Sequence, residues 1–317
     1  MKQITLKSLF EFDPTNDPNA LIGNRFLCVN GTLLIVGASG IGKSTFSLQM
    51  CCKFALGLDF LGIRPARKLK TIYVQAENDF GDMAEIFQGL CKSLGVRPKS
   101  AESKLLHKNL KIFSEDQSSG DGFLESLETV VKQEKPDIIL IDPLLSYIGG
   151  DISQQEVVGK FLRNGLNPIL RAHGAACIMV HHVKKGGGGD LNAAMGSVEL
   201  ANSPRATINL TPAKSNSGCD LILEATKRGD RIGLKNAIGE STKRLAILYG
   251  KTGAPSFEVV EPVSFDHPTD GVAARHARVK GYVDRKMKKS DAIAKIAKTE
   301  KVSAKTAGRD YDKLFGS

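Results

Sequence analysis

The strongest chemical signal in the sequence is an eight-residue run, GASGIGKS, at residues 37–44. It matches the phosphate-binding pattern G-x-x-x-x-G-K-[ST] in full and lies between a strand pattern and a helix pattern. Its glycines let successive backbone N–H groups surround a phosphate, Lys43 adds a positive charge, and Ser44 offers a hydroxyl ligand for Mg²⁺. A site for ATP and Mg²⁺ is therefore predicted. Its nucleotide-binding residues are expected to be Gly37, Ala38, Ser39, Gly40, Ile41, Gly42, Lys43, Ser44 and Thr45.

The chemistry also needs a carboxylate that holds the metal and a base that orients the attacking water. Asp142 ends the apolar run Ile138–Ile141, which is typical of a buried parallel strand, and we expect it to join Ser44 at the metal. Many P-loop ATPases place a catalytic glutamate directly after this aspartate, but here Pro143 follows. Glu77, just after another predicted strand, is the candidate base. The alternative for Glu77 is a structural role as an acidic residue at the start of the next helix, although Asp79 is the better candidate for that cap.

A histidine pair, His181 and His182, follows a third apolar run at the same kind of strand end. Side chains alternate along a strand, so one histidine should face the nucleotide and the other should face away. A zinc site would need further ligands, and no Cys or His is suitably spaced. A residue that senses the γ-phosphate is the favoured interpretation, and a buried, hydrogen-bonded histidine is the alternative.

Short β-branched runs alternate with helical patterns, which predicts an α/β fold with a largely parallel twisted sheet. The predicted strands of this part are Thr32–Val36, Thr71–Gln75, Leu110–Phe113, Ile138–Ile141 and Ala176–Val180. The predicted helices are Ser44–Phe54, Asp79–Leu94, Phe123–Gln133 and Gln155–Ala172. Four later strands, expected as antiparallel additions with turns near 214–218 and 229–239, are Ala206–Leu210, Leu221–Ala225, Leu245–Leu248 and Phe257–Val260.

Taken together, residues from about 20 to 260 resemble the RecA-like hexameric helicase family, and within it the plasmid RepA-type, DnaB-related replicative helicases. The segments that carry the resemblance are GASGIGKS, YVQAEN, IILID, VHHVKKG and MGSVELANSPR. The resemblance implies a RecA-like P-loop core in which Lys43 contacts the phosphates, Glu77 activates water and His182 couples the nucleotide state to DNA binding.

The resemblance also implies residues that act on a neighbouring subunit. Arg205, in the ANSPR segment, matches the arginine finger of the family. Lys227 and Arg228 are similar to a K-x-R-x-G pattern of DnaB-type relatives, but compressed by two residues. Exposed surface charge is the alternative for all three. If any of them acts in trans, the protein must oligomerise into a ring or a filament, and a ring, expected to be a hexamer, is favoured.

Two glycine-containing loops are candidates for holding single-stranded DNA. They are residues 149–151 and a stretch from Lys184 and Lys185 through four glycines. A glycine-rich loop with two lysines suits contacts to phosphates. The alternative is an ordinary exposed loop.

The C-terminal segment is strongly basic. From Arg275 onward it has thirteen Lys or Arg against five Asp or Glu, in a chain with a net charge of +10. Ser290 and Ser303 are expected to cap two helices in a helix-turn-helix outline, supported by a helix over 273–287. Lys305, Thr306 and Arg309 would then lie nearest to DNA, including duplex DNA. The alternatives are a solvated basic tail and a protein docking module.

These patterns predict an ATPase core at 1–260, a linker at 261–272 and a small all-α basic region at 273–317. We see no membrane span or signal peptide, and six cysteines without a C-x-x-C pair suit reduced thiols in the cytoplasm. The favoured function is an ATP-driven DNA helicase or translocase in replication of a plasmid, phage or mobile element. The alternative is a nucleotide-switched DNA-binding regulator or loader that does not unwind DNA. A small-molecule kinase is disfavoured, because it leaves Glu77, the histidine pair and the basic tail unexplained.

Overall fold

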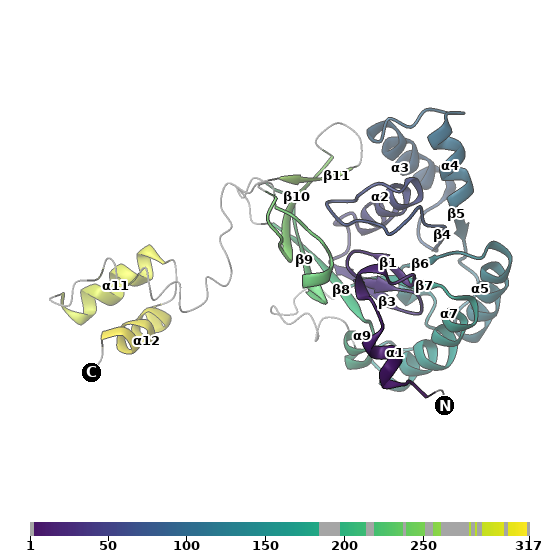
Figure 1. Cartoon of the computed structure of the whole chain (residues 1–317). Coiled ribbons are helices and arrows are strands. Elements are labelled where there is room, and N and C mark those ends of the chain that lie inside the picture. The colour runs from purple at the N-terminus through teal and green to yellow at the C-terminus, as the bar shows by residue number, and fades with distance from the viewer. Residues whose placement is uncertain are drawn as a thin grey trace. The chain divides into compact units, whose positions relative to one another are not determined.

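The computed structural model describes residues 3–183, 197–213, 219–236, 239–250, 256–260, 279, 283, 287–300 and 304–315. The chain divides into two compact units, Met1–Pro262 and Val263–Ser317, and each is described separately below (Figure 1). The predicted linker, 261–272, lies outside the described residues, so the predicted domain limits stay a prediction.

The first unit is built on a nine-stranded sheet with the order β11-β10-β9-β8-β3-β7-β6-β4-β5. Its strands are β3 (Thr32–Gly37), β4 (Thr71–Gln75), β5 (Leu110–Ser114), β6 (Ile138–Asp142), β7 (Ala176–His182), β8 (Ala206–Pro212), β9 (Leu221–Lys227), β10 (Arg244–Tyr249) and β11 (Phe257–Val260). The six strands from β5 to β8 in this order pair in parallel, and β9, β10 and β11 continue the sheet in antiparallel pairing. This arrangement confirms the predicted α/β class with a largely parallel sheet.

The prediction that Ala206–Leu210 is an antiparallel addition is wrong. β8 runs parallel to β3, with Ala206 opposite Leu33. More than twenty residues separate the end of β7 from the start of β8, and a parallel pair needs a crossover of roughly a dozen residues or more. The chain is therefore long enough to return to the edge at which β3 begins. Within the described nine-stranded sheet, the antiparallel additions are β9, β10 and β11.

Helices cover both faces of the sheet (Figure 1). They are α2 (Lys43–Leu56), α3 (Phe80–Ser93), α4 (Ala101–Asn109), α5 (Gly120–Glu134), α6 (Gln155–Gly159), the π-helical η3 (Lys160–Leu166), α7 (Asn167–His173) and α9 (Val198–Asn202). One core joins α2, α3 and α4 to one face, and a second joins α5, η3, α7 and α9 to the other. Leu33 and Ile35 belong to the first core and Leu34 to the second, because side chains alternate along β3. The short helix α4 was not predicted.

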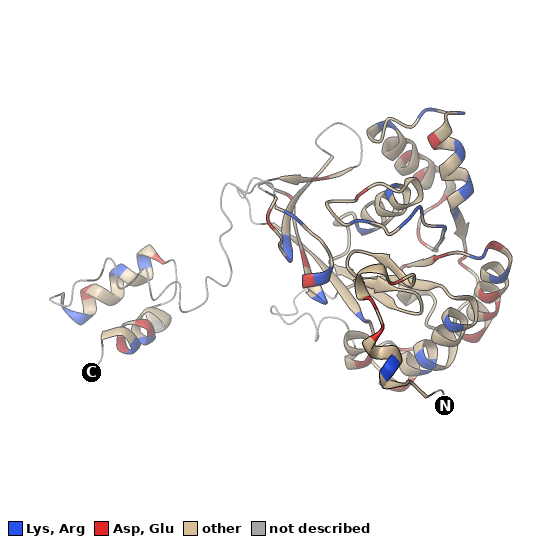
Figure 2. Ribbon diagram, in the orientation of Figure 1, with Lys and Arg blue, Asp and Glu red and all other residues tan. Residues whose placement is uncertain are grey.

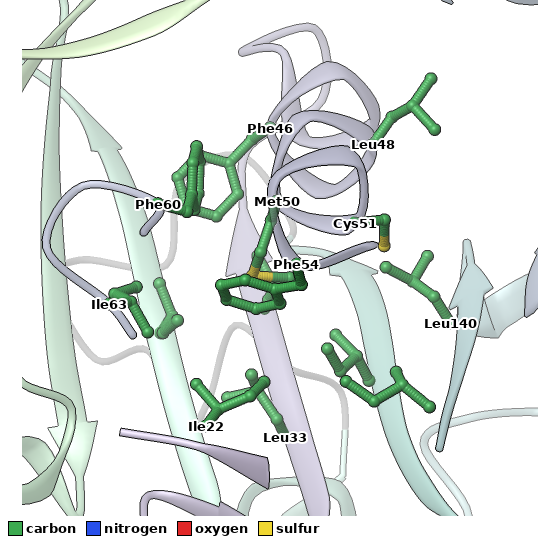
Figure 3. Close-up of a cluster of buried hydrophobic side chains, with 14 of the residues drawn as sticks. Ile22, Leu33, Phe46, Leu48, Met50, Cys51, Phe54, Phe60, Ile63 and Leu140 are labelled. Atoms are coloured by element: carbon green, nitrogen blue, oxygen red, sulfur yellow. The ribbon is translucent and has the colours of Figure 1, made fainter. Parts of the chain in front are cut away.

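Helix α2 is held by the apolar stripe that its sequence predicts. Phe46, Met50 and Phe54 lie four residues apart and point into one cluster with residues from the sheet and the following loop (Figure 3). The rings of Phe46 and Phe60 meet edge to face with centroids 4.9 Å apart. Burial of a phenylalanine contributes about 1.5–3 kcal/mol. The helix that begins at Lys43 is thus fixed rigidly beneath the P-loop.

The remaining elements of the first unit are short. They are α1 (Leu6–Phe10), β1 (Ala20–Ile22), β2 (Leu27–Cys28) and the 3₁₀ turns η1 (Pro14–Asn16), η2 (Leu144–Ser146) and η4 (Gly229–Arg231). Cys28, Cys51, Cys52, Cys91 and Cys177, which are expected as unpaired thiols, are free. Among the described residues, no helix combines the length and apolar character needed to cross a bilayer.

The second unit contains α11 (Lys289–Thr299) and α12 (Ala304–Phe315) around a small core that includes Ile296 and Ala307. Basic and acidic residues both occur along these helices (Figure 2). Ser290 is not an N-cap, because α11 begins one residue earlier, with Lys288 at the cap position, and the Ser290 hydroxyl bonds to the Asp291 carboxylate. The predicted cap Ser303 and most of the predicted supporting helix lie outside the described residues.

Candidate nucleotide site

The parallel sheet brings the predicted chemical groups to one edge. The P-loop follows β3, His182 ends β7, Asp142 ends β6, and Glu77 follows β4. Gly37 pairs with His182 across β3 and β7, and Gln75 pairs with Asp142 across β4 and β6. The carboxyl edge of a parallel sheet is the usual place for a ligand in this class of fold.

The P-loop backbone requires glycine at several positions. Gly40 and Gly42 have φ angles of +79° and +88°, which disfavour other residues. A Cβ atom on Gly37 would lie 2.7 Å from the carbonyl oxygen of Leu210. Gly42 is the N-cap of α2, so the loop delivers free backbone N–H groups and the helix dipole to the same point.

The ammonium group of Lys43 is held inside this loop. Its Nζ atom donates to the carbonyl oxygen of Ala38 at 2.7 Å and lies 2.8 Å from Nδ1 of His182. Burial lowers the pKa of Lys43 to about 8, against the opposing charges of Asp142 and Glu77. A charged lysine can only donate a hydrogen bond, so Nδ1 of His182 must accept it. The proton of the neutral imidazole is then on Nε2.

His182 links Lys43 to Glu77. Nε2 of His182 lies 3.7 Å from Oε2 of Glu77, so the imidazole stands between the phosphate-binding cation and the candidate base. His181, the other member of the pair, is buried. His182 is thus the histidine that contacts the P-loop lysine, and the roles predicted for the two histidines stay predictions.

Glu77 lies on a turn that the buried side-chain amide of Gln75 stabilises. The Gln75 side chain donates to the carbonyl oxygen of Asn78 and accepts from its N–H, at 2.9 and 2.8 Å. The Glu77 side chain is 55% exposed, which leaves it accessible to a ligand. Asp79 caps α3 through the N–H of Asp82, so the helix start does not need Glu77.

Asp142 has one oxygen engaged and one oxygen free. Oδ2 accepts a 2.5 Å hydrogen bond from the Tyr73 hydroxyl, and the Ser44 hydroxyl also bonds to the carboxylate. Oδ1 is buried and has no hydrogen-bond partner among the described residues. Burial raises the pKa of Asp142, while the bonds from Tyr73 and Ser44 lower it. An unengaged carboxylate oxygen beside a serine hydroxyl fits the oxygen ligands that Mg²⁺ prefers.

An aromatic pair borders the P-loop. Tyr249 stacks on Phe257 with centroids 4.7 Å apart, and a Cβ atom on Gly42 would lie 3.1 Å from the Phe257 ring. Gln49 of α2 fixes Phe257 by bonding to both its N–H and its carbonyl oxygen. Phe257 is buried, whereas Tyr249 is 40% exposed.

The three predicted trans residues lie away from this edge. Arg205 precedes β8, and its backbone N–H donates to Thr32 at the start of β3, whereas the P-loop follows the end of β3. The Lys227 ammonium donates to the carbonyl oxygens of Ala201, Asn202 and Pro204.

Arg228 donates to the carbonyl oxygen of Arg25. Lys227 and Arg228 thus have roles within the chain, and only Arg205 keeps an exposed side chain without a hydrogen bond or ion pair to the described residues. The predicted DNA-binding residues are less fully described: Lys184 and Lys185 lie outside the described residues, and so does the Lys305 side chain. On α12, Thr306 is half-buried and Arg309 is exposed.

Sequence reasoning missed Tyr73, Gln75 and the Tyr249–Phe257 pair. A signal existed for the first two, because Tyr73 and Gln75 alternate with the apolar residues Ile72 and Val74 and must share a face of the strand. No local signal marks Tyr249, because its place beside the P-loop depends on the pairing of β10 with β11.

The fold and the site define a P-loop, nucleotide-binding ATPase with a RecA-like α/β core. The chain belongs to the AAA_25 family, described as an AAA domain, whose model matches residues 5–188. This match includes the P-loop, Glu77, Asp142 and His182.

Among solved structures, a KaiC-like protein from the hyperthermophilic archaeon Pyrococcus horikoshii OT3 is similar to the chain. The two are 19% identical over 74% of this chain and 91% of that protein, with a TM-score of 0.47. No curated protein matches the sequence.

Proposed function

We propose that this ATPase is a ring-forming DNA helicase or translocase that acts in the replication of a plasmid, phage or mobile element. The observation that carries the proposal is the chain of contacts from Lys43 through His182 to Glu77. It joins the phosphate-binding cation to the candidate base. In the sequence, His182 also lies two residues before Lys184 and Lys185, the predicted contacts to single-stranded DNA.

In the proposed reaction, Glu77 accepts a hydrogen bond from the attacking water and orients it toward the γ-phosphate. Lys43 and the P-loop N–H groups stabilise the negative charge of the phosphates. Mg²⁺, held through Ser44 and Asp142, would neutralise further charge on the β- and γ-phosphate oxygens. The exposed face of Tyr249 is suited to stack on the base.

Nucleotide binding would change the contact between Lys43 and His182. The phosphates compete for the same ammonium group, so His182 is released when Lys43 turns to them. A histidine that moves at the end of β7 can pass the nucleotide state to the residues that follow. Coupling of this kind, in which phosphate contacts order or release a neighbouring segment, is a known type of switch.

Arg205 supports the oligomer in this proposal. Five residue steps of β3, about 16 Å, separate the level of Thr32, where Arg205 is attached, from Gly37. The arginine is therefore poorly placed to reach its own P-loop and is available to a neighbour. Repeated head-to-tail contacts of this kind form a ring when the rotation between subunits closes, and this is the assembly proposed here.

The N-terminal segment also supports an oligomer. Leu6 and Phe10 of α1 are 74% and 89% exposed, and Ile4 and Leu9 are exposed as well. Such an unpartnered apolar group costs free energy in water and marks an interaction surface. Phe12, beneath the Arg25 guanidinium, ties the segment to the core. Phe10→Asp should lower the molar mass measured by light scattering.

The basic C-terminal segment supports DNA as the partner. Deletion of residues 275–317 should weaken DNA binding and reduce its dependence on salt, because fewer phosphate contacts release fewer counterions. Unchanged affinity and salt dependence would contradict a role for this segment as the main DNA contact.

The decisive experiment compares ATP hydrolysis with and without single-stranded DNA and measures strand displacement on a forked duplex. Stimulation and unwinding by a verified oligomer are the expected results. A verified oligomer that shows neither would overturn the helicase proposal and favour the nucleotide-switched regulator, which the basic segment also suits.

A further inference from the structure

The buried hydroxyl of Tyr73 is a part of the site that the mechanism above does not use. Tyr73 lies in the middle of β4, and its ring is fully buried in the core shared with α2. Its hydroxyl donates to Oδ2 of Asp142 at 2.5 Å. The Ser44 hydroxyl lies within hydrogen-bonding reach of both groups and has one proton to donate to either of them. The two predicted metal ligands and this phenol therefore form one group of neighbouring oxygens.

The hydrogen bond from Tyr73 fixes the plane of the Asp142 carboxylate. With Oδ2 engaged by Tyr73, Oδ1 is the oxygen that has no hydrogen-bond partner among the described residues. A half-turn of the carboxylate only exchanges two equivalent oxygens, whereas a turn of its plane would move its oxygens away from the phenol and leave this buried donor without the acceptor. Such a loss is unfavourable for a buried donor.

We propose that Tyr73 is a positioning residue for the metal: its hydroxyl holds Asp142 so that Oδ1 faces the Mg²⁺ that accompanies the nucleotide. Tyr73 does not touch the metal in this role and acts through Asp142. The inference rests on the proposed binding of ATP with Mg²⁺ and does not depend on DNA or unwinding.

A purely structural role for Tyr73 makes a different prediction. A phenylalanine would fill nearly the same space in the core, so loss of the hydroxyl would then alter stability but not metal binding. A positioning role requires a specific loss of metal affinity, while nucleotide binding without metal stays nearly unchanged.

The chain offers a matched control in Tyr147. Its hydroxyl is also inside the protein and donates to a backbone carbonyl, that of Glu115, at 2.9 Å. Its ring is fully buried and stacks on Phe123 in the core on the other face of the sheet. Tyr147→Phe thus removes one hydroxyl from the interior, as Tyr73→Phe does, but one that donates to the carbonyl oxygen of Glu115 and not to Asp142.

The experiment measures binding of fluorescent ADP in EDTA and then its titration with Mg²⁺, with Mn²⁺ binding followed by electron paramagnetic resonance. Tyr73→Phe should weaken Mg²⁺ binding about tenfold or more, because the carboxylate loses the hydrogen bond that orients it. Its affinity for ADP in EDTA should change by less than about twofold, and Tyr147→Phe should match the wild type in both.

Metal affinity equal to wild type in Tyr73→Phe would overturn the inference. So would an equal loss of ADP affinity in EDTA, which would show general damage to the P-loop. If the wild type itself binds no nucleotide, the proposed function is wrong and the inference falls with it. Should Tyr73→Phe not fold, Tyr73→Met also lacks the hydroxyl, adapts to an irregular core and permits the same measurements.

A double-mutant cycle adds a second readout. In an Asp142→Asn background, Tyr73→Phe should have no further effect on metal affinity, because the oriented carboxylate is already gone. An undiminished effect in that background would also contradict the inference.

Discussion

The Nζ atom of Lys43 and the Nδ1 atom of His182 lie 2.8 Å apart, although 139 residues separate them in the chain. The contact joins the cation that meets the phosphates to the last residue of β7. The ammonium group cannot keep its hydrogen bond to His182 and bind incoming phosphates in the same position. Nucleotide binding should therefore change the contact between Lys43 and His182.

We expect His182→Ala to bind ATP within a few-fold of wild type but to hydrolyse it about tenfold or more slowly. The variant loses the group between Lys43 and Glu77 while the Ala38 contact still holds the lysine. Hydrolysis should also lose its response to single-stranded DNA. Steady-state rates with and without DNA check this, with His173→Gln as a control at a half-buried histidine that contacts Glu128. A preserved DNA response would contradict the coupling role.

Nucleotide affinity should fall as the pH rises through about 8, because the pKa of Lys43 is lowered to about 8 by burial. The neutral amine no longer attracts the phosphates, so affinity should decline by up to about tenfold per pH unit above the pKa. Titration of ADP binding from pH 6.5 to pH 9.5 tests this. Constant affinity over that range would contradict a buried, ionising lysine at the phosphates.

A rise in pH should affect folding stability in the opposite direction from nucleotide affinity. The unfolded chain keeps a Lys pKa near 10.5, so between about 8 and 10.5 it binds more protons than the folded chain. Folding stability from this group therefore rises with pH across that window, while nucleotide affinity falls. Measurement of both quantities on the same samples separates a local charge effect from general unfolding.

Glu77→Gln should keep ATP binding and lose hydrolysis by about a hundredfold or more, as expected when a general base is removed. Asp79→Asn is the matched control, because Asp79 caps α3 and asparagine is also a good cap. The control should keep nearly full activity and stability. Single-turnover hydrolysis measures the activity of both variants. An active Glu77→Gln enzyme would show that the base is another residue.

Tyr249→Ala should weaken the binding of ATP and ADP but not that of inorganic tripolyphosphate. The exposed tyrosine ring beside the P-loop offers a stacking surface, and aromatic stacking on a base contributes about 1–3 kcal/mol. Tyr249→Phe keeps the ring and should bind like the wild type. Competition titrations with the three ligands measure this, and an equal loss for tripolyphosphate would point to a disturbed loop instead.

Arg205→Ala should lower hydrolysis by about a thousandfold, the typical effect of removing an arginine finger. Mixing this variant with Lys43→Ala, which is inactive for another reason, should restore part of the activity. Each Arg205→Ala subunit keeps an intact P-loop and can receive Arg205 from a Lys43→Ala neighbour. Absence of restoration in mixed oligomers would show that Arg205 does not act across the interface.

The sequence alone determined the parts of this protein that depend on neighbouring residues. The P-loop pattern, the strand Thr71–Gln75 and the stripe of Phe46, Met50 and Phe54 all follow from local spacing. Such spacing decides backbone conformation and which face of an element is apolar. The Asp79 cap also depends only on neighbouring residues, since its hydrogen-bond partner is three residues away.

Only the tertiary structure decided which distant groups meet. Strand order places Tyr73 against Asp142, puts Tyr249 beside Gly42 and makes β8 parallel to β3. It also directs Lys227 to the end of α9 and leaves Arg205 exposed at the opposite edge from the P-loop. These outcomes depend on pairing between strands far apart in the chain, and local patterns specify the face of a strand but not its neighbour.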